Sequence, residues 1–255
     1  MFATPELTAG PTMAHALSML QKDLRPAAAP DASSYIAYAQ AIQAAYRERL
    51  KGMGDADGKR ALGAEALAPS CTTHFSIVDR DGNMAAVTQT LLSSFGSRYV
   101  LPQSGITMNN GIMWFDPTPG GANALAPGKR CLCNYTPVVA HTADGRRFAV
   151  GASGGRRILP AVMQMLSFVM DFGMDLDAAI HQPRIDASEG NIVIADIRLP
   201  REVRDVLRAQ FDYEEARVQH YPGKFAFPSL VLRDGTINFG ATQIFHPWAD
   251  VVAED

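Results

Sequence analysis

A threonine that begins a predicted strand is the first candidate for chemistry in this sequence. Thr72 follows the Gly-, Ala- and charge-rich stretch 51–70 and opens a β-type run. A hydroxyl is a weak nucleophile unless a base lies beside it. A Thr at a chain terminus carries its own base, the α-amine, whose pKa is about 7.7–8.0. That amine exists only after the bond between Cys71 and Thr72 is cut, so Thr72 is either an ordinary strand-initial residue or a self-generated N-terminal nucleophile.

A pair of glycines is the second candidate. Gly154 and Gly155 stand in GASGGRRI, between a predicted strand and a predicted helix. Their N–H groups could stabilise a developing negative charge near the helix N-terminus. The alternative is a turn that needs glycine for its backbone angles. His74 follows Thr72 by two residues, so the pleat places it on the same strand face; we favour a structural role for it, because the α-amine already supplies a base.

Composition excludes several classes of function. The chain has 255 residues, 47% of them hydrophobic, and a net charge of −3, which fits one or two globular domains. Charges of both signs are spread along it, so we expect no nucleic-acid partner. Cys71, Cys131 and Cys133 are too few for a disulfide framework and lack a second ligand pair at zinc-site spacing. We expect no metal, no other cofactor and no membrane span, and the first residues lack the pattern of a secretory signal.

The elements that must position these residues come in blocks. The pattern predicts helices over 11–24, 31–50, 157–173, 175–181 and 201–210. Strands are predicted within 72–91, 136–142, 147–153, 184–186, 192–196 and 229–241, mostly as hairpins, with two further runs near 94–100 and 105–109. Hairpins beside helical blocks favour an α+β fold of antiparallel sheets layered with helices over a doubly wound parallel sheet.

Four ordered motifs resemble one family. TTHFSIVDRDGNMAAVTQTLLSSFGS, SGITMNNG, APGKR and GASGGRRI are similar to the small subunit of the γ-glutamyltransferases (γ-glutamyltranspeptidases), which are N-terminal-nucleophile hydrolases. The resemblance implies that 1–71 is the end of a large-subunit-like segment and 72–255 a small-subunit-like catalytic domain. It implies an αββα sandwich that is incomplete without the N-terminal half, so we expect a missing large-subunit half or a second chain as partner. Relatives are usually periplasmic or secreted.

The resemblance also implies a mechanism. The Thr72 hydroxyl would attack the preceding carbonyl, cleave the chain after Cys71 by an N→O acyl shift, and then form a γ-glutamyl-enzyme intermediate with a glutathione-type substrate. Water, or the amine of an amino acid or peptide, would take the acyl group. Thr90 matches the family's second threonine, which hydrogen-bonds the nucleophile. Gly154 and Gly155 match the oxyanion-hole pair.

The sequence departs from the family where the glutamyl head group should be held. The Asn that the family usually places two residues after the second Thr is Leu92 here. The substrate-binding candidates are Asn110, Gly111, Trp114, Cys133 and Asn134. Gly111 and Trp114 align with the family's Gln and Asp. Cys133 and Asn134 align with its paired serines. Trp for Asp removes a charged partner and adds apolar surface. Asp116 either replaces that charge or is a turn residue before Pro117. Two alternatives stay open, an acylase of a different amide and a non-catalytic relative that keeps only the fold.

Overall fold

A computed structural model describes residues 1–54, 71–219, 223–243, 245 and 248–253. Five strands form the main sheet, in the order β1 (Phe2–Ala3), β4 (Val138–His141), β5 (Arg147–Ser153), β9 (Phe227–Asp234) and β10 (Ile237–Thr242). Every neighbouring pair in this sheet is antiparallel. Two more strands, β2 (Thr72–Val78) and β3 (Met84–Thr90), form a separate antiparallel hairpin. The sheet and the hairpin therefore follow the predicted hairpin pattern.

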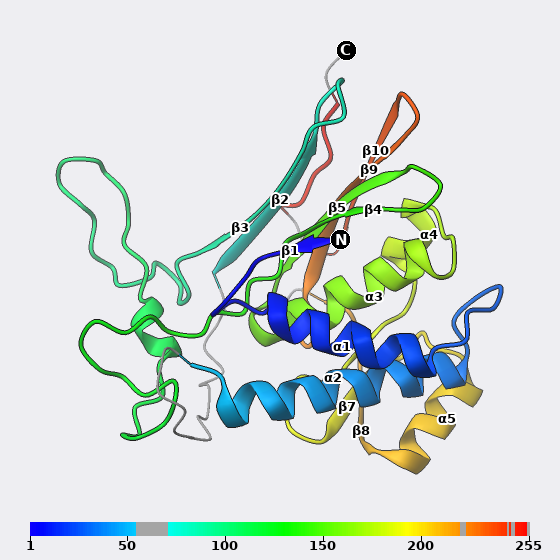
Figure 1. Cartoon of the computed structure of the whole chain (residues 1–255), viewed down its shortest axis with the longest axis horizontal. Helices are drawn as coiled ribbons and strands as arrows, with labels where there is room; N and C mark the ends of the chain where they lie inside the picture. The colour runs from blue at the N-terminus through cyan, green and yellow to red at the C-terminus, as the bar shows by residue number, and fades with distance from the viewer. Residues whose placement is uncertain (55–70, 220–222, 244, 246–247, 254–255) are drawn as a thin grey trace.

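The helices cover one face of the main sheet and the hairpin covers the other (Figure 1). The helices are α1 (Gly10–Asp23), α2 (Ala32–Gly52), α3 (Ile158–Met170), α4 (Leu176–His181) and α5 (Arg201–Gln210). Along β5, Phe148, Val150 and Ala152 belong to the core shared with the helices, so the residues between them point toward the hairpin. The layers are thus helix, sheet and hairpin, three of the four layers that an αββα sandwich requires.

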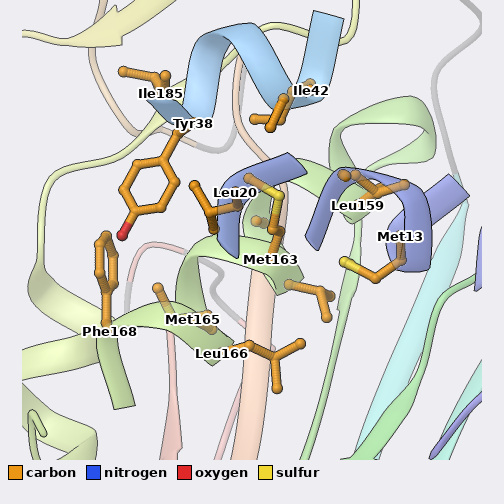
Figure 2. Close-up of a cluster of buried hydrophobic side chains, with 14 of the residues drawn as sticks. Met13, Leu20, Tyr38, Ile42, Leu159, Met163, Met165, Leu166, Phe168 and Ile185 are labelled. Carbon is orange, nitrogen blue, oxygen red and sulfur yellow. The ribbon is translucent and has the colours of Figure 1, made fainter. Parts of the chain in front are cut away.

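The hydrophobic core lies around α3, between the main sheet and the helices α1 and α2. Met163, Met165 and Leu166 on α3 are fully buried, and they gather with Leu20 from α1 and Ile42 from α2 (Figure 2). Helix α2 begins where the sequence predicts, because the Asp31 carboxylate accepts the Ser34 N–H at 2.9 Å in a capping box. Residues on both sides of Cys71 therefore build a single core.

Three features differ from the expected elements. The runs near 94–100 and 105–109 are not strands; they share only one isolated bridge, between Val100 and Thr107, because positive φ angles at Phe95 and Arg98 turn the chain. A third sheet holds β6 (Ile185–Asp186), β7 (Ile192–Asp196) and β8 (Asp212–Ala216). The β7–β8 pair is parallel, unlike the expected antiparallel pairing, because α5 carries the chain back between them. No helix among the described residues is long and apolar enough to cross a membrane.

Candidate active site

The hydroxyls of Thr72 and Thr90 lie 3.0 Å apart where the hairpin ends. Thr72 and Thr90 are partners in the β2–β3 register, so their side chains point to the same face. The Thr90 hydroxyl also donates to the carbonyl oxygen of Cys71 at 2.9 Å, and the Leu91 N–H donates to the same oxygen at 3.2 Å. The carbonyl before Thr72 therefore accepts two hydrogen bonds in the uncut chain.

The single proton of the Thr90 hydroxyl sets the direction of these bonds. That proton is donated to the Cys71 carbonyl, and the same oxygen accepts the Leu92 N–H at 2.9 Å. The Thr72 hydroxyl must then donate to Thr90 across the 3.0 Å contact. Thr90 thus connects the candidate nucleophile to the carbonyl that it would attack.

The backbone at Leu92 is bent into the left-handed region, with a φ of 72°. This turn directs the Leu92 N–H back to Thr90, while the Leu92 carbonyl accepts the Cys71 N–H at 2.7 Å. A left-handed conformation is unfavourable for leucine and common for asparagine. The backbone therefore has the geometry that suits an asparagine, although the side chain is apolar.

Two contacts fix how the hairpin lies along β5. At one end, Arg147 of β5 donates to the Gly82 carbonyl in the hairpin turn at 2.9 Å. Further along, the ring of His74 lies against Gly151 of β5. Going from the turn back toward Thr72 therefore means going forward along β5 toward Ser153, so the nucleophile end of the hairpin points to the glycine loop.

The glycine pair has two different roles in that loop. Gly154 has a φ of 144°, and a Cβ there would come within 2.7 Å of the Ala226 backbone, so close packing requires glycine. Gly155 has a φ of 64°, and a Cβ there would meet no heavy atom within 4 Å. Gly155 begins the 3₁₀ turn η2 (Gly155–Arg157), which leads into α3. The turn and the oxyanion-hole alternatives are compatible here, because the loop both needs glycine and opens at a helix N-terminus.

Among the substrate-binding candidates, Asn110 and Gly111 lie next to the nucleophile corner, which consists of Thr72, Thr90 and the Cys71 carbonyl. The Asn110 side chain accepts the Ser93 N–H at 3.0 Å and donates to the Ser93 hydroxyl at 2.8 Å. Its backbone N–H bonds the Leu91 carbonyl at 3.1 Å. The Cys131 thiol donates to the Gly111 carbonyl at 3.5 Å. The structure therefore brings residues 110–114 and the stretch 131–135, which includes the predicted Cys133 and Asn134, to one place beside the end of β3.

The second half of this loop pair is apolar. Trp114 ends the 3₁₀ turn η1 (Gly111–Trp114) and packs edge-on against Tyr135, with ring centroids 5.3 Å apart. Burial raises the pKa of the Cys133 thiol, so it stays neutral, and Asn134 is buried. Asp116 is 4% exposed and accepts the Thr118 N–H at 2.8 Å, which is a turn contact. The described candidates therefore present a tryptophan where the resembling family presents a carboxylate.

Two contributors were missed by sequence reasoning. The Leu91 N–H is one, because a backbone donor leaves no trace in the residue type. Arg49 is the other: it is buried and donates to the Cys133 carbonyl at 2.7 Å and to the Thr8 carbonyl at 2.9 Å, so α2 holds the 131–134 stretch in place. An arginine in the last turn of a helix is common because its charge interacts favourably with the helix dipole, so its type and position do not single out Arg49.

Comparison with known sequences finds one matching family model and relatives that are named as hydrolase or acylase proenzymes. Residues 59–236 match the family model described as gamma-glutamyltranspeptidase. The glutathione hydrolase proenzyme of Bacillus subtilis (strain 168) is 40% identical over 114 residues, which are 45% of this chain and 19% of that protein. The acylase ACY 1 proenzyme of Pseudomonas sp. (strain SE83) is 30% identical over 200 residues, which are 78% of this chain and 36% of that protein. This chain therefore spans a minor part of the length of both relatives.

Solved structures give the same fold. A highly active mutant of the γ-glutamyltranspeptidase from Pseudomonas nitroreducens, with one tryptophan replaced by aspartate, superposes with a TM-score of 0.59 and 28% identity, covering 72% of this chain and 100% of that one. The cephalosporin acylase from Bacillus halodurans superposes with a TM-score of 0.75 and 23% identity, covering 94% of this chain and 48% of that one. At that identity the acylase supports the fold alone.

Proposed function

Since this chain belongs to the γ-glutamyltranspeptidase family, we propose that it carries the N-terminal nucleophile of an amide hydrolase or acyltransferase. Thr72 is that nucleophile, and its α-amine is the base. The observation that supports this best is the hydrogen-bonded group at the end of the hairpin, where Thr90 bonds both the Thr72 hydroxyl and the Cys71 carbonyl. Such a group has a use in the uncut chain and a second use after cleavage.

In the first step the chain cuts itself. The Thr72 oxygen attacks the Cys71 carbonyl carbon, and Thr90 takes the proton of Thr72 while passing its own to the carbonyl oxygen. The Leu91 N–H stabilises the same oxygen, as an oxyanion-hole donor does. The C–N bond then breaks, the nitrogen takes a proton, and an ester joins Cys71 to the Thr72 oxygen. Water hydrolyses that ester, which leaves a carboxyl group on Cys71 and a free amine and hydroxyl on Thr72.

The second step is the transfer of an acyl group. Cleavage releases Thr90 from the Cys71 carbonyl, so its proton can turn to the Thr72 oxygen. Thr72 attacks the amide carbon of a substrate, its α-amine accepts the hydroxyl proton and returns one to the leaving amine. The N–H groups of Gly154 and Gly155 hold the developing oxyanion. This role is supported by the open surroundings of Gly155, where a Cβ would meet no heavy atom within 4 Å. Water or an acceptor amine then attacks the ester and regenerates Thr72.

Two classes of acyl donor fit this site. A γ-glutamyl amide is the substrate class that the family implies, with the head group held by Asn110, Gly111, Trp114, Cys133 and Asn134. The second candidate is an amide whose acyl group lacks an α-ammonium. The Trp114 side chain favours the second, because an aromatic ring packed edge-on against Tyr135 offers apolar contact in place of a carboxylate. The long match to an acylase proenzyme also supports it.

The partner that we propose is further polypeptide against the outer face of the β2–β3 hairpin. Phe75 and Ile77 point outward there and are 39% and 53% exposed, and Val87 lies beside them on β3. An exposed apolar strand face is normally covered. A large-subunit-like half or a second chain would supply the fourth layer of the sandwich.

Purification of the whole protein and of its Thr72→Ala variant tests this function. We expect intact mass and a denaturing gel to show two pieces that separate before Thr72 for the wild type, and one uncut chain for the variant. Acyl release is then measured with γ-glutamyl anilide and glutaryl anilide as matched donors. A wild type that stays uncut, or that is cut and releases no acyl group from any donor, would overturn the catalytic function and favour a relative that keeps only the fold.

A further inference from the structure

The inner face of the hairpin carries a histidine whose two ring nitrogens are both hydrogen-bonded. His74 Nδ1 lies 2.8 Å from the hydroxyl of Thr88, its register partner on β3, and Nε2 lies 2.9 Å from the hydroxyl of Ser76. A neutral imidazole has one donor and one acceptor nitrogen, so one hydroxyl donates to the ring and the other accepts from it. These bonds hold the ring in one orientation between the two sheets.

The ring of His74 lies directly on the backbone of Gly151. A Cβ at position 151 would be 2.3 Å from the ring Cε1, 2.4 Å from Nδ1 and 2.7 Å from Nε2. Gly151 does not have the positive φ that would itself require glycine, and it stands inside β5, paired with Ser229. Glycine inside a strand is unfavourable and marks the close approach of another group. Here that group is the imidazole.

This contact joins the two strands that carry the two parts of the candidate site. His74 lies two residues from Thr72 on β2, and Gly151 lies three residues from Gly154 at the end of β5. Because a strand advances about 3.3 Å per residue, both reacting parts are within roughly 10 Å of the contact. The second anchor, from Arg147 to the Gly82 carbonyl, sets the direction of the hairpin but lies at its far end.

We propose that His74 is a positioning residue, whose ring, seated on Gly151, sets the separation between Thr72 and the Gly154–Gly155 loop. This rests on the proposed function. A role as general base fits less well, because both ring nitrogens are already bonded to Thr88 and Ser76. In this arrangement a methyl group added at residue 151 fits only if the side chain at residue 74 is smaller than histidine, so the effects of substitutions at the two positions depend on each other.

The test is a double-mutant cycle on the whole protein with Gly151→Ala, His74→Ala and both together. A misplacement of about 1 Å at an active site can cost about 100-fold in rate, so we expect Gly151→Ala to lower kcat by about that factor and KM by little. His74→Ala should lower kcat by about tenfold. The double variant should be at least tenfold more active than Gly151→Ala alone, because the ring that the new methyl group meets is gone.

Two controls separate positioning from general damage. Gly52→Ala adds a methyl group where nothing lies within 4 Å, so it should keep kcat within about threefold. Ser76→Ala removes one bond to the ring while leaving it on Gly151, so it should lower kcat by less than His74→Ala does. If Gly151→Ala fails to fold, recovery of folded protein by His74→Ala in the same chain gives the coupling, and the kcat of His74→Ala against Ser76→Ala gives the positional effect.

The outcomes are distinct. A double variant whose loss equals the product of the single losses, or a Gly151→Ala variant with unchanged kcat, overturns the positioning role of His74 alone. A wild type that neither cuts itself nor releases acyl groups overturns the proposed function, and this role with it. The same cycle measured as unfolding of the uncut Thr72→Ala protein should show coupling whether or not turnover occurs.

Discussion

The nucleophile corner and the proposed acyl-binding loop, which is residues 110–114 together with Cys133 and Asn134, lie side by side but differ in how their polar groups are bonded. In the corner, the Thr90 hydroxyl donates to the Cys71 carbonyl and accepts hydrogen bonds from the Thr72 hydroxyl and the Leu92 N–H. The Cys71 carbonyl also accepts a second hydrogen bond, from the Leu91 N–H. In the loop, Trp114 offers a ring edge packed on Tyr135, and the Cys133 thiol is kept neutral by a raised pKa. Under the proposed function, this difference means that the bond-forming step and the choice of acyl group depend on separate segments, so one can change while the other is kept.

The largest effect is expected from the corner. Thr72→Ala removes the attacking oxygen, so self-cleavage should stop and acyl release should fall by at least about 10⁴-fold, as for other lost nucleophiles. The measurement is intact mass together with the rate of anilide release. Thr73→Ala is the matched control, since its side chain points to the outer, exposed face of β2. Loss of cleavage in the Thr73 variant as well would show that the hairpin tolerates no change there and would remove the distinction.

The second prediction concerns Thr90. Thr90→Ala removes the bond to the Cys71 carbonyl and the acceptor for Thr72, so self-cleavage should slow by about 10²–10³-fold, the usual effect of one lost oxyanion donor. Thr90→Ser keeps the hydroxyl and should cleave within about tenfold of the wild type. The half-time of the uncut chain on a denaturing gel measures both. Equal rates for the alanine and serine variants would contradict the hydroxyl's role.

The third prediction moves to the loop and to substrate choice. Trp114→Asp places a carboxylate where the family has one, so the ratio of γ-glutamyl to glutaryl release should rise by about 10–100-fold, the worth of a hydrogen bond to a charged group. A relative's mutant with the same exchange of residue type is described as highly active. Trp114→Phe is the control and should leave the ratio unchanged. A ratio that does not move in Trp114→Asp would mean that residue 114 does not contact the acyl group.

What could be predicted from the sequence follows the same division. The hairpin, α2 and α3 were predictable because hydrophobic period and capping residues are local: Asp31 and Ser34 form the capping box that starts α2. The 94–109 stretch was predicted wrongly as strands, since its β-type residues are interrupted by positive φ angles. Gly96 and Gly105 are residue types that allow such angles, but Phe95 and Arg98 are not.

The site was predictable only where residue type carries the chemistry. Thr72, Thr90 and the glycine pair could be proposed from type and order. Arg49 could not be proposed, because it bonds the backbone carbonyl of Cys133, a residue distant in sequence. The Leu91 N–H could not be proposed either, because every residue type except proline has a backbone N–H and only the main-chain geometry directs this one to Cys71. Gly151 had a usable signal, a glycine in the middle of the apolar run RFAVGAS, which indicates close approach of another group.

The fourth prediction concerns how the free energy of unfolding changes with pH through two buried groups, His74 and Asp186. Burial lowers the pKa of His74 from 6.5 to about 4, so the unfolded chain binds a proton that the folded chain refuses, and stability falls as the pH falls from 6.5 through 4. Burial raises the pKa of Asp186 from 3.8 to about 6, so its contribution is present below 3.8 and is lost as the pH rises through 6. The two slopes oppose each other in the wild type.

His74→Asn isolates the first slope. In the uncut Thr72→Ala background, the free energy of unfolding in urea is measured at several pH values between 4 and 7 with and without His74→Asn. The advantage of the histidine-containing protein should shrink steadily as the pH falls, because only that protein loses stability by protonating an imidazole at position 74. Asp186→Asn should remove the opposite slope. Parallel curves for the histidine and asparagine proteins would contradict the buried, neutral imidazole.

The smallest effect is expected on stability, at Leu92, which follows the corner in the chain. Leu92 holds the left-handed turn that returns its N–H to Thr90, at a cost of about 1 kcal/mol or more for a leucine. Leu92→Asn should stabilise the uncut Thr72→Ala protein by about 1 kcal/mol, because asparagine adopts this conformation readily. Leu91→Asn, one residue earlier and without a positive φ, should give no gain. Urea unfolding measures both, and equal effects at the two positions would mean that the turn is not strained. γ-Glutamyl release is measured separately, with Leu92→Asn in the chain that keeps Thr72. A gain in stability at residue 92 without faster γ-glutamyl release would show that the backbone of the corner suits an asparagine while the choice of substrate depends on other residues.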